Sequence, residues 1–263
     1  MAMTAAKRAR VSRGIQYALL IAVVGFLALI ADWEKITNSF FNLEVAKEQF
    51  PGIITTAFAN TLLFTALGLV AGMSGGILLA LMKLSSVGPY RWIATTYIEI
   101  FRGLPALLVF IVFGYGVPAA FSISLNTYLT AMLALGTVSA AYIAETIRAG
   151  LQAVPPGQME AARSLGMSHP RAMVTIIIPQ ALRIVLPPLT NEVILLTKDS
   201  SLIYVLGLTV SQYDLTRFGR VGLTAANAGL TPLVLAGAFY LIITIPLSYL
   251  SRRFEAKTAR MKK

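Results

Sequence analysis

A short polar segment within an apolar region of the sequence has the side chains needed to handle a charged solute. Its polar residues are Asn191, Glu192, Lys198, Asp199 and Ser200. Glu192 and Asp199 are seven residues apart, as are Asn191 and Lys198, and seven residues make nearly two helical turns. We therefore expect one polar stripe that lines or gates a path for a zwitterionic solute. The structural alternative is that Lys198 and Asp199 pair with each other or with neighbouring helices.

Catalytic chemistry finds little support in the sequence. Cysteine is absent and His169 is the only histidine, so cysteine-ligated metal sites and histidine clusters for metal or haem are excluded. No glycine-rich loop ends in Gly-Lys-Ser/Thr, which excludes ATP hydrolysis by this chain. No paired-carboxylate motif is apparent. We expect a non-catalytic protein without a cofactor or metal of its own.

The composition is that of an all-α integral membrane protein. Of the 263 residues, 57% are hydrophobic and 13% charged, and the mean hydropathy is +0.74, whereas soluble domains are about 25% charged. The net charge of +11 does not indicate nucleic-acid binding, because the basic residues are scattered between apolar runs instead of sharing a face with aromatic residues.

The elements that must position the polar segment are membrane-spanning helices of roughly 20 residues. Five apolar runs are long enough, at 15–31, 53–82, 103–121, 124–147 and 231–250. A sixth, 181–207, contains the polar segment and is interrupted by Pro187 and Pro188. Such a break is tolerated only where neighbouring helices or a water-filled cavity satisfy the freed backbone groups. We expect about six spans, with close packing at Gly72, Gly75 and Gly76 and an anchor for the fourth span at Glu145 and Arg148.

The distribution of basic residues predicts the orientation, because cytoplasmic loops carry an excess of Lys and Arg. Both tails are basic, the segment 32–52 is acidic, and the segment 148–183 holds four arginines. Both termini and the segment 148–183 are therefore expected in the cytoplasm. The first span, with Ala28 and Ala31 at its end, also resembles a secretory signal peptide. Its apolar run of about 17 residues exceeds the usual 7–15, which favours a retained helix.

The segment 151–179 is expected to form a compact helical projection. Pro156 suits the first turn of a helix, and Gly166 can end that helix in the left-handed conformation. Ser168 then caps a second short helix with Pro170 in its first turn.

The small side chains of Ala161, Ala162 and Gly166 would let another protein approach this backbone closely. Glu160 and Arg163 would make charged contacts at the rim of such an interface. An ordinary connecting loop is the alternative.

The spacing of this segment resembles a known family. The pattern E-A-A-x3-G-x9-I-x-L-P is the signature loop of bacterial ABC importer permeases. It occurs here at Glu160, Ala161, Ala162, Gly166, Ile176 and Pro179, with Ile178 in place of the usual leucine. The resemblance implies that this loop forms coupling helices that insert into a groove of a separate ATPase subunit, with Glu160, Ala161, Ala162, Arg163, Gly166 and Ser168 as the coupling residues.

The similarity extends over 51–252 and is closest to the polar amino-acid uptake branch. It is carried by the segments 60–81, 97–116, 141–168 and 186–202. It implies a five-helix permease domain over 51–252, preceded by a tail, an extra span and an external segment (1–50) and followed by a basic tail (253–263). Glu99 and Arg102, just before Gly103, are expected at the cytoplasmic interface. The Arg-Gly-x-Pro segment of this family implies instead that Arg102 lies close to the substrate route.

The resemblance also implies the partners. They are two ATPase subunits that bind ATP and magnesium, a second permease copy or paralogue, and an extracytoplasmic amino-acid-binding protein, all at the bacterial cell membrane. The expected function is ATP-driven import of a polar amino acid by alternating access. The alternative is a secondary transporter driven by protons or sodium through Glu192 and Asp199. That class often shows internal repeats with paired broken helices, and the sequence contains only one such helix.

Overall fold

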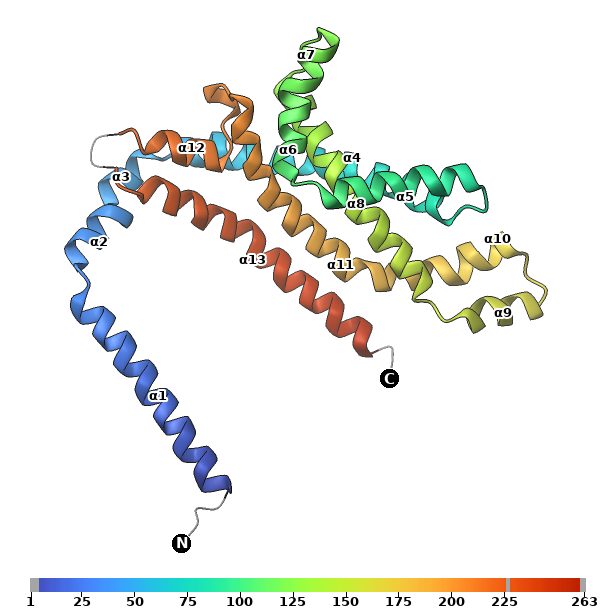
Figure 1. The fold of residues 1–263 in the computed structure, drawn as a ribbon, viewed down its shortest axis with the longest axis horizontal. Helices are drawn as coiled ribbons and strands as arrows, with labels where there is room; N and C mark the ends of the chain where they lie inside the picture. The colour runs from blue at the N-terminus through green and yellow to red at the C-terminus, as the bar shows by residue number, and fades with distance from the viewer. Residues whose placement is uncertain (1–4, 226–227, 261–263) are drawn as a thin grey trace.

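The computed structural model describes residues 5–225 and 228–260, and every element in these ranges is helical (Figure 1). The α-helices are α1 (Ala5–Ile30), α2 (Trp33–Phe40), α3 (Leu43–Glu48), α4 (Ala59–Leu84), α5 (Gly88–Gly103), α6 (Ala106–Ile111), α7 (Val117–Phe121), α8 (Thr127–Gln152), α9 (Pro156–Ser164), α10 (His169–Ala172), α11 (Ile178–Asp199), α12 (Leu215–Gly222) and α13 (Thr231–Arg260). Three π-helical segments (Ile53–Phe58, Val112–Gly116, Met173–Ile177) and two 3-10 segments (Ser200–Leu206, Val210–Gln212) adjoin them. The outermost residues of both predicted basic tails, 1–4 and 261–263, lie outside the described residues.

The predicted number of membrane spans is confirmed within these ranges. Five helical segments are long and apolar enough to cross a membrane: Ser12–Ile30, Ile53–Leu84, Thr127–Gln152, His169–Leu206 and Thr231–Thr258. A sixth span results if Gly88–Gly103 and Ala106–Phe121, which meet at 106°, are counted as one broken span. The run predicted at 103–121 is helical from Ala106 to Phe121, and it counts as a span only together with Gly88–Gly103. Pro105 disfavours helical geometry in the residue before it, and Leu104 is extended at φ −88° and ψ 140°.

The centre of the bundle is the contact between α4 and α8, which run side by side. A Cβ atom added at Gly72 would collide with Ser139, and one at Gly76 with Ile143. The predicted role of these glycines in close helix packing is confirmed, because small residues let membrane helices approach each other closely.

We expect Gly72→Leu to destabilise the protein by about 1–3 kcal/mol or more, the usual effect of overpacking a tight core. The side chain has no space between α4 and α8. Thermal unfolding in detergent would measure the loss. Gly25→Leu in α1 is the matched control, since a Cβ there meets no atom within 4 Å. Equal melting temperatures for the two variants would contradict this packing.

Helix α11 runs unbroken through Pro187 and Pro188, so the predicted interruption of this span is wrong. Pro187 has no N–H to donate to the carbonyl of Arg183. The Thr258 hydroxyl on α13 donates to that carbonyl instead, at 3.1 Å. The requirement that a neighbouring helix satisfy the freed backbone group is therefore met, and α11 stays helical.

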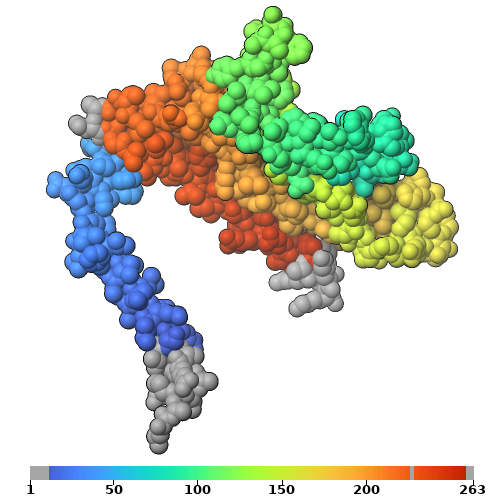
Figure 2. Space-filling model, viewed as in Figure 1, coloured from blue at the N-terminus to red at the C-terminus, as the bar shows by residue number. Residues whose placement is uncertain are grey.

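Helix α1 stands apart from the rest of the chain (Figures 1 and 2). None of the window Ser12–Ile30 is buried. The following segment joins the bundle where the Asn42 N–H donates to the Thr231 hydroxyl of α13 at 3.0 Å. An extra helix is thus fastened to the bundle at one end and exposes an apolar surface suited to lipid along its length.

Candidate functional site

A cavity of about 340 Å³ lies between α8, α11 and the break that separates α5 from α6. Its lining residues are Leu104, Pro105, Ala106, Phe110, Leu135, Val138, Ser139, Tyr142, Glu192, Leu195, Leu196 and Asp199. This volume is within the range of about 300–1,000 Å³ that holds small-molecule ligands. The break at Leu104–Pro105, which the hydropathy pattern did not reveal, therefore forms one wall of the site.

The cavity brings together the two predicted carboxylates, Glu192 and Asp199, on one face of α11. Neither has an ion pair or a hydrogen bond to another side chain within the described part of the chain. Carboxylates beside apolar walls are stable when a cation or hydrogen-bond donors reach them. Their oxygens are thus available to a cationic group in the cavity.

Arg102 lies at the edge of this site. Its guanidinium carbon is 5.5 Å from the centre of the Tyr142 ring, and Glu192 is within electrostatic range of both Arg102 and Asp199. Tyr142 and Ser139 were missed as lining residues by the sequence analysis. Their spacing of three residues within the helix is the signal that could have shown them, since residues three apart share a helix face.

The remaining predicted path residues lie elsewhere, so the expected single stripe divides into two faces. Asn191 lines a separate groove against α13 with Pro187 and Ser251. Lys198 is exposed outside the cavity, within electrostatic range of Asp199. Ser200 is buried and donates to the Thr197 carbonyl at 2.7 Å.

The second region of interest is the projection formed by α9 and α10, which extends from the bundle beyond α8 and α11 (Figures 1 and 2). Helix α9 ends as predicted at Gly166, whose φ is +84°. The Gly166 N–H donates to the Arg163 carbonyl and the Met167 N–H to the Ala162 carbonyl, at 3.0 and 3.1 Å. These two bonds define a Schellman motif, which favours glycine at this position.

The side chains of the projection differ in exposure. Glu160, Ala161, Arg163, Gly166 and Ser168 are exposed, whereas Ala162 is 2% exposed and packs inside the projection. The side chain of Ala162 thus faces inward, and its role in coupling stays a prediction. Ser168 stands at the N-cap of α10 as predicted, but its side chain makes no capping hydrogen bond.

Leu165 is the residue of the projection that sequence reasoning missed. Its side chain is 84% exposed at the turn between α9 and α10. A single leucine between Ser164 and Gly166 in a polar turn is the signal that could have shown it. The exposed side chain offers apolar area that a protein partner could bury.

The second arm of the projection is continuous with the helix that carries the two carboxylates. Helix α10, the segment Met173–Ile177 and α11 form one helical span, His169–Leu206. The helix after Ser168 begins where it was predicted, but it is not a separate short helix, because it continues into α11. Val154, Ile177 and Ala181 form a small buried cluster that fixes the projection to the ends of α8 and α11.

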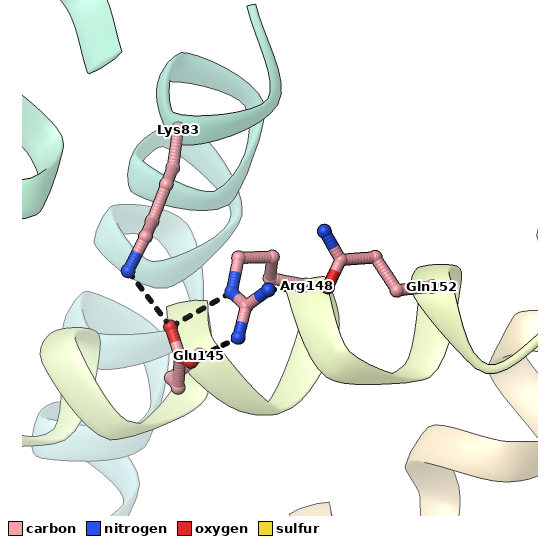
Figure 3. A network of polar contacts seen from close by, with 4 residues as sticks. All are labelled: Lys83, Glu145, Arg148 and Gln152. Carbon is pink, nitrogen blue, oxygen red and sulfur yellow. Dashed lines mark hydrogen bonds and ion pairs between the residues drawn. The ribbon is translucent and has the colours of Figure 1, made fainter.

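Charged side chains join α4 to α8 near the same end of the bundle (Figure 3). The Lys83 ammonium is 3.1 Å from Glu145 Oε2, and the Arg148 guanidinium pairs with the same carboxylate and with Gln152. The predicted anchor formed by Glu145 and Arg148 on α8 thus includes Lys83 on α4.

We expect Glu145→Gln to destabilise the protein by about 1–3 kcal/mol, because two cations lose a half-buried charged acceptor. Thermal unfolding in detergent measures the effect. The exposed pair between Lys47 and Glu44, 2.9 Å apart, supplies the control Glu44→Gln, whose effect should stay below about 1 kcal/mol. A loss no greater for Glu145→Gln than for Glu44→Gln would rule out an anchoring role.

At the other end of the bundle, Asp214 is fully buried and caps α12. Its carboxylate accepts the N–H groups of Thr216 and Arg217 at 2.9 and 3.0 Å, and the Tyr240 hydroxyl donates to it at 3.4 Å. Burial raises the pKa of Asp214, which these hydrogen bonds oppose. This carboxylate joins α12 to α13.

The chain matches the family model described as the binding-protein-dependent transport system inner membrane component over residues 72–260. It is 38% identical over 218 residues to the probable glutamine ABC transporter permease protein GlnM of Bacillus subtilis (strain 168), covering 81% of this chain and 98% of that protein. It is 34% identical over 209 residues to the arginine transport system permease protein ArtQ of the same organism, covering 80% of this chain and 93% of ArtQ.

A solved structure is also similar. A chain of an amino acid ABC transporter, crystallised with histidines, superposes with a TM-score of 0.74 at 36% identity, covering 82% of this chain and 98% of that one. The similarity therefore includes both the sequence and the arrangement of the helices.

Proposed function

The chain belongs to the family of binding-protein-dependent transport system inner membrane components, and we propose that it imports a polar amino acid in an ATP-driven complex. As a permease subunit it is a non-catalytic, multi-pass membrane protein. The glutamine and arginine permeases and the amino acid transporter among its relatives support the substrate class.

One observation carries the proposed mechanism: a rigid exposed projection continues directly into the helix that lines the cavity. The residues of the projection would bind a separate ATPase subunit, which binds ATP and magnesium. Closure of two such ATPases would move the loop 160–179 and tilt α11. Because Glu192 and Asp199 lie on α11, that movement would switch the cavity between outward and inward access.

The proposed assembly has four kinds of component. They are this permease, a second copy or a paralogue of it, the ATPase pair, and an extracytoplasmic amino-acid-binding protein. In this arrangement the projection and both termini face the cytoplasm of the bacterial cell. The basic residues of the tails and of 148–183 support that orientation.

Reconstitution tests this function against the ion-coupled alternative. The permease, its ATPase and its binding protein would be placed in proteoliposomes with radiolabelled amino acids. We expect uptake that requires ATP on the ATPase side and persists when ionophores dissipate proton and sodium gradients. Uptake that continues without ATP and stops with ionophores would establish the secondary-transporter alternative.

A further inference from the structure

A second cavity, a groove of about 230 Å³, lies between α11 and α13 where the end of α13 runs beside the first turns of α11 (Figure 1). Its lining residues are Arg183, Leu186, Phe254, Lys257 and Thr258. Two of these five residues are cations, and none of the described residues that line the groove is acidic. The groove therefore has the chemistry of an anion site bordered by apolar side chains.

The groove lies at the depth of lipid headgroups. The candidate span that ends at Thr258 begins at Thr231 and has 28 residues. At 1.5 Å per residue it is about 42 Å long, which matches the roughly 40–45 Å of a bilayer that includes its headgroup layers. The Thr258 hydroxyl donates to the Arg183 carbonyl at 3.1 Å. The arginine of α11 is therefore at the same level as the end of α13.

Apolar surface continues from the groove toward the middle of the membrane. Leu250 stands four residues before Phe254 on α13, and residues four apart share a helix face. Leu250 is 41% exposed, as is Leu186 on the facing side of the groove. A ligand bound here would thus meet cations at its head and exposed leucines along its tail.

The two cations are suited to phosphate oxygens. An arginine guanidinium binds phosphate through two parallel N–H groups, and a lysine ammonium binds it as a point charge. Arg183 already has an interaction within the chain, but five N–H donors allow a guanidinium to serve more than one acceptor. Glu255 lines a neighbouring groove with Asn191, and a residue two positions from Lys257 does not share its helix face.

We propose that this groove binds the headgroup of an anionic phospholipid. Arg183 and Lys257 bind the phosphate oxygens, and the acyl chains lie along the exposed leucines of both helices. Basic pockets between membrane helices are typical sites for such headgroups. A soluble phosphate compound offers the same charge but leaves the apolar surface uncovered, so the position of the groove between two spans favours the lipid. The bound lipid would join the ends of α11 and α13.

Lipid binding to the assembled complex tests this proposal independently of transport. The permease would be purified with its ATPase in detergent and titrated with phosphatidylglycerol, phosphatidylcholine or glycerol 3-phosphate. Native mass spectrometry would count the molecules that remain bound. We expect phosphatidylglycerol to bind about tenfold or more tightly than either of the other two compounds.

The variant Lys257→Gln assigns the binding to this groove. It should weaken phosphatidylglycerol binding about fivefold, whereas Lys257→Arg, which keeps the charge, should stay within about twofold of the wild type. The control Arg252→Gln removes an exposed cation of the same helix that lines neither groove, and it should also stay within about twofold.

Three results would overturn the proposal. Equal affinity for the two lipids would show that the groove does not select an anionic headgroup. Equal losses in Lys257→Gln and Arg252→Gln would show a general attraction to the basic end of α13. Binding of glycerol 3-phosphate as tight as that of phosphatidylglycerol would show a site for a soluble anion instead of a lipid.

Discussion

Replacing Leu165 by aspartate is expected to reduce binding-protein-stimulated ATP hydrolysis by about tenfold or more. The leucine is almost fully exposed at the tip of the projection, where it would fill an apolar pocket of the ATPase. A carboxylate in place of this apolar side chain would have to be buried in the contact, and an unpaired buried charge is costly. The measurement is ATP hydrolysis by the reconstituted complex, with and without substrate-loaded binding protein.

Leu165→Met is the matched control, because methionine keeps an apolar side chain of similar volume. We expect near wild-type hydrolysis from this variant. Gly166 is less suitable for such a test. Its φ of +84° means that any larger residue strains the turn itself, so a loss of coupling there would not identify the contact surface. Full stimulated hydrolysis in Leu165→Asp would show that the ATPase binds elsewhere.

Gly166 and Ala162 differ in how far the sequence could predict their positions in the projection. Gly166 was predictable because the conformation it adopts depends on local backbone sterics, which favour glycine. The inward position of Ala162 was not, because an alanine is compatible with both the buried and the exposed face of a short helix. Only the packing of α9 against α10 and Met173–Ile177 decides which face it occupies.

The cavity also has features that the sequence could predict and features that it could not. Hydropathy predicted the span that contains Glu192 and Asp199, and their spacing correctly placed them on one helix face. The separation of Asn191 from Glu192 follows from helix geometry, because adjacent residues of a helix do not share a face. The sequence could not show that α13 covers the face of Asn191, where Ser251 lines the same groove. The continuity of α11 through two prolines likewise depends on Thr258, a residue 75 positions from Arg183.

The second large effect is expected from Glu192→Gln, because the proposed substrate path passes through the cavity that this carboxylate lines. Binding-protein-dependent uptake into proteoliposomes should fall about tenfold to a hundredfold, since hydrogen bonds to charged groups contribute about 1.5–3 kcal/mol. Assembly with the ATPase should be unaffected, because Glu192 lies in the cavity lining, away from the projection. Uptake and co-purification measured on one preparation distinguish the two processes.

The comparison of this variant with Leu165→Asp separates coupling from passage of the substrate. Leu165→Asp should lose stimulated hydrolysis and uptake together. Glu192→Gln should lose uptake while the ATPase still assembles, because only the surroundings of the substrate have changed. Glu44→Gln, which removes an exposed carboxylate, should retain both. If Glu192→Gln transports at the wild-type rate and normal expression, then α11 contributes to structure and the amino acid crosses the membrane by a route that does not involve this carboxylate.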